Sequence, residues 1–184
     1  LIASSKRGNS RLVSVVLGAV SEAMRGNDKD WGQGLNKVYE VLANDLVYAN
    51  PGNLVIFGDN HDMSRFYTQV KHDVDLLKMG MTILLTTRGI PQIFYGTEVL
   101  MANPNSNEHG EIRGDMYGGW TGDTKSAFTG QGLSPAEKDA QAFFRKILNW
   151  RKSNEVIHTG KLLHFGPVDG VYVYFRYSAK GKVM

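Results

Sequence analysis

The segment FGDNHDMSR, residues 57–65, places a dense group of polar side chains directly after an apolar run at residues 54–57. Asp59, Asn60, His61, Asp62 and Arg65 can each donate, accept or titrate. A carboxylate beside an imidazole can grip ligand hydroxyl groups, and it can take part in proton transfer. We therefore take this segment as the first candidate site.

Other interpretations of the same residues stay open. His61 and Asp62 could form an ordinary turn, in which an Asx side chain bonds to the backbone. A His-Asp pair also binds divalent metals in phosphohydrolases, but such a site needs further His or Asp ligands, and the sequence lacks the companion motifs. Arg65 could contact a ligand or pair with Asp59, and Asn60 could contact a ligand or shape the turn.

A second group of candidates lies in the Gly-, Asn- and Asp-rich segment 97–132, which shows no clear periodicity. Loops of this length inside a compact domain are usually functional. An aromatic face combined with charged groups is suitable for binding a small ligand, although a loop Trp can equally be a local plug. The candidates in this segment are His109, Arg113, Asp115 and Trp120.

The elements that must position these residues alternate in type. Patterning predicts strands at 11–17, 54–57 and 90–96, and helices at 18–26, 35–48, 73–87 and 134–154. Ser134, Pro135 and Glu137 form a helix-start signature. The apolar run at 54–57 is typical of a strand covered on both faces. Strands alternating with helices predict parallel βα units, whose working residues gather at the carboxyl ends of the strands.

From residue 161 onward, apolar and polar residues alternate around a turn at Val168, Asp169 and Gly170. This pattern predicts a β-hairpin and a second, all-β module.

The composition of the chain excludes other classes of protein. It has 184 residues, a formal net charge of +3 and 0 cysteines, so neither a nucleic-acid partner nor a Cys-ligated metal is favoured. No apolar stretch is long enough for a membrane span, and the two ends suggest a piece of a longer protein.

Two motifs together resemble the α-amylase family of retaining glycoside hydrolases. FGDNHDMSR is similar to that family's fourth signature region, and RGIPQIFYGTE, residues 88–98, is similar to its last barrel strand. The helix through Trp150, Arg151 and Lys152 resembles the one that closes the barrel before an antiparallel β-domain. The resemblance covers residues 35–184. It is closest to the starch-degrading amylase and neopullulanase branch of gut Bacteroides-type bacteria.

The resemblance implies an α/β fold: the C-terminal part of a (β/α)8 TIM barrel followed by the start of an antiparallel all-β domain. Residues 1–160 would hold the last βα units of the barrel, with segment 11–17 as its sixth strand. Residues 161–184 would begin the β-domain. A periplasmic or secreted location is suggested by the family alone.

The resemblance also implies roles for single residues. Asp62 would be the transition-state stabiliser that grips the 2- and 3-hydroxyls of the sugar, and His61 would donate to the same hydroxyls. The family's nucleophile and general acid belong to motifs that this sequence lacks, so the chain alone should be inactive while its parent cleaves α-1,4-glucosidic bonds with retention. The substrate-binding residues would be Asn60, Arg65, Arg113, Asp115 and Trp120.

The expected partner is an α-glucan oligosaccharide or polysaccharide. We expect no cofactor in this chain, with calcium possible in the full-length parent. Open sheet edges predict self-association. An alternative function is a non-catalytic, amylase-like module for carbohydrate binding or interaction. An Asp and a Glu at the fourth and fifth strand ends of the parent would distinguish the enzyme from that module.

Overall fold

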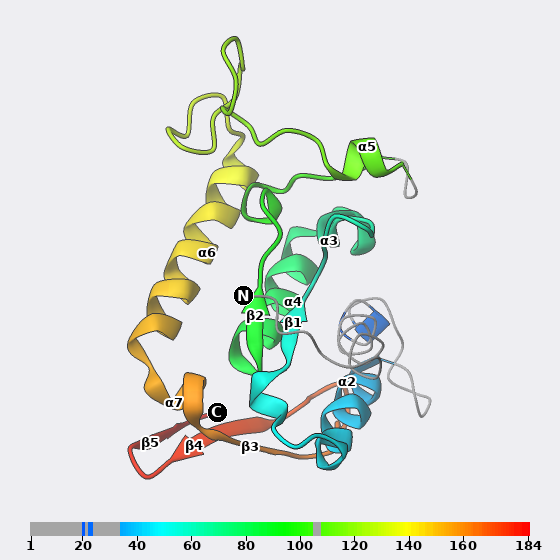
Figure 1. Cartoon of the computed structure of the whole chain (residues 1–184), viewed down its shortest axis with the longest axis vertical. Coiled ribbons are helices and arrows are strands. Elements are labelled where there is room, and N and C mark those ends of the chain that lie inside the picture. The colour runs from blue at the N-terminus through cyan, green and yellow to red at the C-terminus, as the bar shows by residue number, and fades with distance from the viewer. Residues whose placement is uncertain (1–19, 21, 24–33, 105–107) are drawn as a thin grey trace.

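The computed structural model describes residues 20, 22, 23, 34–104 and 108–184 (Figure 1). The strand predicted at 11–17 and most of the helical turn at 18–26 lie outside these residues. The first described helix of more than a few residues is α2, Gly34–Ala43, which continues as the 3-10 turn η1, Asn44–Val47. It buries Val38 and Leu42 on one face, as the helical spacing predicts.

The central unit of the fold is a parallel strand–helix–strand arrangement. After the turn η2, Pro51–Asn53, strand β1, Val55–Phe57, runs parallel to β2, Ile90–Gln92. Helix α4, Val74–Thr86, connects them, and Asp73 caps it by accepting from the N–H groups of Asp75 and Leu76. These residues confirm the predicted βα order.

Gly89 sets the start of β2. Its φ of +108° lies in a region that residues with a Cβ rarely adopt, and an added Cβ would lie 2.8 Å from the Leu54 carbonyl oxygen. This close approach lets the Ile90 N–H donate to that same oxygen at 2.8 Å. The backbone conformation and the close approach of Leu54 therefore explain why position 89, in the segment RGIPQIFYGTE, is a glycine.

The prediction that β1 is covered on both faces is wrong for this structure. Ile56 is 1% exposed, but Val55 is 38% exposed and its register partner Ile90 is 53% exposed. In the described part of the chain, β1 and β2 form a sheet of only two strands. Helices therefore cover one face of this pair and leave apolar side chains open on the other.

Helix α6, Pro135–Ser153, packs along α4 (Figure 1). Ser134 accepts from the Glu137 N–H, and the Glu137 carboxylate accepts from the Ser134 N–H, which is the predicted capping box. The core that holds these helices on β1 buries apolar side chains from each element. Its members include Val38, Leu42, Ile56, Phe66, Leu77, Met81, Leu84, Ala140 and Phe144.

The C-terminal part is an antiparallel sheet that follows the short helix α7, Glu155–Thr159. Its strands are β3, Lys161–His164, β4, Tyr174–Ser178, and β5, Gly181–Val183. The predicted turn is present, with positive φ at Asp169 (51°) and Gly170 (75°) and a bridge between Val168 and Val171. This sheet lies at the amino ends of β1 and β2 (Figure 1). No helix among the described residues is long and apolar enough to span a membrane.

Candidate functional site

The candidate site lies where the chain leaves the carboxyl ends of β1 and β2. Segment 58–65 follows β1 and leads into the short helix α3, Phe66–Gln69. After β2, the chain passes through the turn η3, Thr97–Val99, and then the short helix α5, His109–Ile112. Because parallel strands end at the same edge, the two motifs that resemble the amylase family meet there.

Asp59 anchors the segment after β1. It is 2% exposed, and its carboxylate accepts from the Phe66 N–H at 2.8 Å and from the Thr97 hydroxyl at 3.2 Å. Burial raises the pKa of Asp59 to about 6, although these two hydrogen bonds and the nearby Arg65 charge oppose the rise. Asp59 therefore joins the β1 loop to η3 rather than facing a ligand.

Arg65, like Asp59, is buried and holds the loops together. Its side chain is fully buried, Nη1 donates to the Tyr95 carbonyl at 2.7 Å, and the guanidinium carbon lies 4.6 Å from the centre of the Phe94 ring. No ion pair joins it to Asp59 in the described ranges, so the guanidinium bonds to a backbone carbonyl instead of forming the ion pair that was one of the two alternatives. In this structure Arg65 lies out of reach of a ligand in solvent.

Asn103 is a positioning residue that the sequence interpretation missed. It is fully buried, its side-chain oxygen accepts from the Arg65 N–H at 2.8 Å, and its own N–H donates to the Thr68 hydroxyl at 2.9 Å. It ties the segment after η3 to the start of α3. An Asn in a loop rich in Asn and Gly has no sequence pattern that separates this role from that of a turn former.

Asn60, His61 and Asp62 occupy the exposed tip that this framework supports. The Asn60 side chain accepts from the Asp62 N–H at 2.8 Å, which is the Asx turn left open by the sequence. His61 Nε2 lies 3.2 Å from Asp62 Oδ2, and the two side chains are 62% and 61% exposed. The Asp62 carboxylate is thus in the open, with His61 beside it.

Arg113 completes the cluster from the far loop. Its Nη2 lies 2.9 Å from Asp62 Oδ1, and its Nε donates to the His61 carbonyl at 3.0 Å. His109, on α5, has its Nδ1 3.3 Å from the same Arg113 Nη2. The Asp62 carboxylate thus lies between a guanidinium and an imidazole, and its exposed oxygens can accept further hydrogen bonds.

The structure does not bring the remaining candidates into this cluster. Trp120 is 67% exposed, and its backbone N–H donates to the Asp123 carboxylate at 3.1 Å, which also caps the Gly118 N–H. Across residues 34–104 and 108–184, no hydrogen bond or ion pair joins Asp115 or Trp120 to Asp62. Trp120 therefore lies exposed on a turn that the Asp123 carboxylate holds, apart from the Asp62 cluster.

Metal binding has no support from side-chain clustering. No group of three or more His, Asp or Glu side chains that could hold a metal ion occurs among the described residues. The His-Asp pair at positions 61 and 62 is engaged instead with Arg113, whose positive charge disfavours a bound cation.

Comparisons with known proteins agree with this geometry. The family model for the alpha amylase catalytic domain matches residues 23–160, and the model for the cyclo-malto-dextrinase C-terminal domain matches residues 162–184. The crystal structure of the alpha-amylase from Geobacillus thermoleovorans, complexed with acarbose, superposes with a TM-score of 0.68 at 24% identity, over 91% of this chain and 34% of that one. The predicted fold, part of a TIM barrel followed by antiparallel strands, is confirmed.

Curated relatives include cyclomaltodextrin glucanotransferases. The one from Thermoanaerobacterium thermosulfurigenes is 30% identical over 157 residues, which are 85% of this chain and 19% of the relative. The one from Klebsiella oxytoca is 25% identical over 164 residues, 78% of this chain and 24% of the relative. The chain thus spans about a quarter or less of these relatives. By its family match, its barrel strands and the two motifs that meet at their ends, the chain belongs to the α-amylase family of glycoside hydrolases.

Proposed function

We propose that this chain supplies the transition-state-stabilising part of an active site that cleaves α-1,4-glucosidic bonds with retention. The observation that carries the proposal is the exposed Asp62 carboxylate, flanked by His61 and Arg113, at the carboxyl ends of β1 and β2. In retaining glycosidases, hydrogen bonds to the sugar 2-hydroxyl strengthen as the oxocarbenium-like transition state forms. Asp62 would accept from the hydroxyls, and His61 would donate to them.

Arg113 would contribute by holding Asp62 in position before substrate arrives. Its two hydrogen bonds fix both the His61 carbonyl and one oxygen of the Asp62 carboxylate. Asn60 would fix the backbone of Asp62 through its Asx turn. Asp115 and Trp120 would contact more distant sugar units, because the loop presents Trp120 to solvent. The nucleophile, the general acid and any bound calcium would come from other parts of the whole protein.

The whole protein that contains this chain should release reducing sugar from maltoheptaose or soluble starch. NMR of the first product should show the α-anomer, because the enzyme nucleophile inverts the anomeric carbon once and water, attacking on the side that the leaving group left, inverts it again. Cyclic products would indicate that a sugar hydroxyl replaces water as acceptor, as the names of the curated relatives suggest. Complete inactivity on every α-glucan would reject the enzyme proposal and leave the carbohydrate-binding alternative.

The chain of residues 1–184 on its own should not turn over these substrates. It holds the supporting carboxylate without the two carboxyl groups that break and form the glycosidic bond. Purified chain assayed on an activated α-glucoside should therefore match the rate of a buffer blank. A rate above the blank, retained after chromatography on a second matrix, would contradict this assignment of roles.

A further inference from the structure

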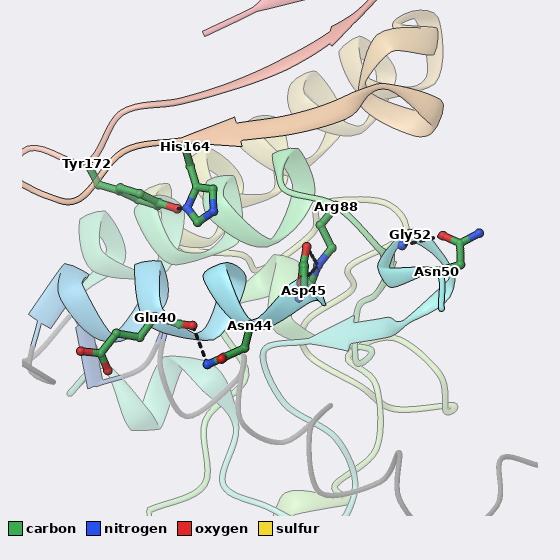
Figure 2. A network of polar contacts seen from close by, with 8 residues as sticks. All are labelled: Glu40, Asn44, Asp45, Asn50, Gly52, Arg88, His164 and Tyr172. Atoms are coloured by element: carbon green, nitrogen blue, oxygen red, sulfur yellow. Dashed lines mark hydrogen bonds and ion pairs between the residues drawn. The ribbon is translucent and has the colours of Figure 1, made fainter. Parts of the chain in front are cut away.

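A cavity of about 650 Å³ lies away from Asp62, between the turns η1 and η2 and the start of β3. It is formed where the C-terminal sheet meets the amino ends of the barrel strands. Figure 2 shows one wall of this region, where the Arg88 side chain meets Asp45, and Asn50 bonds to Gly52 on the neighbouring turn. The cavity shares no lining residue with the candidate active site.

The charges that line this cavity do not balance. Arg88, 4% exposed, is paired with the Asp45 carboxylate, to which its Nε donates at 2.9 Å. Asp45 is the one carboxylate among the described residues that line the cavity, so among these residues the pair leaves no acidic group for the other cations. Those cations are Arg176 and Lys161.

Arg176 is 2% exposed and is held by backbone oxygens alone. Nη1 donates to the Thr87 carbonyl at 2.5 Å, and Nη2 donates to the Gly160 carbonyl at 2.7 Å. Burial and the nearby cations Arg151 and Arg88 lower the pKa of Arg176 to about 10, so it remains charged at neutral pH. Carbonyl dipoles stabilise this charge without neutralising it.

Lys161 supplies an exposed cation to the lining of the cavity. It is exposed, and in the described part of the chain it forms no ion pair. His158, also exposed, lines the same space. Arg176 and Lys161 together give the cavity an uncompensated charge of two, and the Lys161 ammonium and the amide side chains of Asn50 and Asn53 can donate to a ligand there. A doubly charged oxyanion would match this charge and accept from these donors.

We propose that this cavity binds a phosphate group, either free inorganic phosphate or the phosphate of a sugar phosphate. The proposal does not depend on the function proposed for Asp62. A volume of about 650 Å³ exceeds what one phosphate needs, so the attached sugar of a phosphate ester would also fit. The Asp45–Arg88 pair is part of the cavity wall and joins η1 to the segment that follows α4.

The test is a titration of the ¹⁵N-labelled chain with inorganic phosphate, with chloride exchanged to hold ionic strength constant. Phosphate should shift the amide signals of Gly52, Gly160 and Lys161 to saturation. The Lys161→Ala variant should raise the phosphate Kd at least about fivefold, whereas Lys138→Ala, the same charge change on an exposed lysine of α6, should leave it within about twofold.

Further outcomes identify the source of the phosphate or reject the proposal. Tighter binding of glucose 6-phosphate than of inorganic phosphate supports a sugar phosphate, and equal affinities support the free ion. Equal shifts with chloride, equal weakening by both lysine variants, or the same shifts from maltose would each overturn the phosphate site.

Discussion

At the scale of single residues, a substitution at Asp62 can remove the charge of the side chain with little change in its shape. The Asp62→Asn substitution in the whole protein keeps the volume and removes the charge. Loss of a charge-assisted hydrogen bond made in the transition state corresponds to about 1.5–3 kcal/mol, or roughly a 10- to 150-fold fall in kcat with KM little changed. Steady-state kinetics on maltoheptaose measures both constants. A raised KM at unchanged kcat would show that Asp62 binds the ground state and the transition state equally.

Asp59 is a residue whose titration should be visible in stability. Its pKa rises on folding from 3.8 to about 6, so the folded state holds the proton more tightly than the unfolded state. The proton on Asp59 therefore stabilises the folded state fully below pH 3.8. As pH rises toward 6, this contribution to the free energy of unfolding is lost, and it amounts to roughly 3 kcal/mol.

Asp59→Asn removes the titrating proton and keeps an oxygen that can accept from the Phe66 N–H. We expect the free energy of unfolding of the wild-type chain, minus that of the variant, to fall between pH 4 and pH 7. Urea unfolding at a series of pH values gives this difference directly. A constant difference would show that Asp59 ionises normally in the folded chain, and a difference that rises with pH would show that folding lowers its pKa.

At the scale of elements, two ion pairs join segments distant in sequence but differ in burial. Arg88 and Asp45 have side chains that are 5% and 22% exposed, whereas Arg113 and Asp62 are 49% and 61% exposed. When one residue of a buried ion pair is removed, the remaining charge stays in a poorly solvated place. When one residue of an exposed pair is removed, water solvates the remaining charge. The first pair therefore holds η1 against the end of α4, and the second orients a site.

Asp45→Ala should lower the free energy of unfolding by about 3 kcal/mol, because it leaves the Arg88 guanidinium buried without its carboxylate. Arg113→Ala, the matched control at the exposed pair, should change it by less than about 1 kcal/mol. Chemical denaturation of the two variants beside the wild type makes the comparison. Equal losses would mean that burial does not separate the two pairs.

At the scale of the whole molecule, the open face of β1 and β2 is the feature with the largest consequence. Val55 and Ile90 are register partners, and both are exposed. Exposed apolar side chains beside strand edges that have no partner among the described residues favour pairing with another copy of the chain. We therefore keep the prediction that the isolated chain self-associates.

Sedimentation velocity over a range of concentrations should show the chain moving from monomer to larger species. Ile90→Lys should shift this transition to higher concentration, since a charge on the open face opposes its burial. Leu46→Lys, at a residue 85% exposed on η1, is the matched control and should leave the transition in place. A wild-type chain that remains monomeric at the highest concentration would refute the prediction.

Much of the architecture was predictable because its signals are local. The capping box at Ser134, the positive-φ turn at Asp169 and Gly170, and the helical faces of α2 and α4 depend on residues near one another in sequence. The FGDNHDMSR segment also indicated a site at a strand end without any tertiary information. The domain limits at residues 160 and 161, the branch within the family and the sugar contacts remain predictions.

What only the tertiary structure decided concerns contacts between distant segments. Arg113 lies 51 residues from Asp62, and Asn103 lies 38 residues from Arg65, so no local pattern could pair them. Burial likewise separated Arg65 and Asp59, which serve the framework, from His61 and Asp62, which face solvent. The sequence thus determined which chemistry this chain contains, and packing decided which of those groups remain accessible, because exposure depends on neighbours brought together by folding.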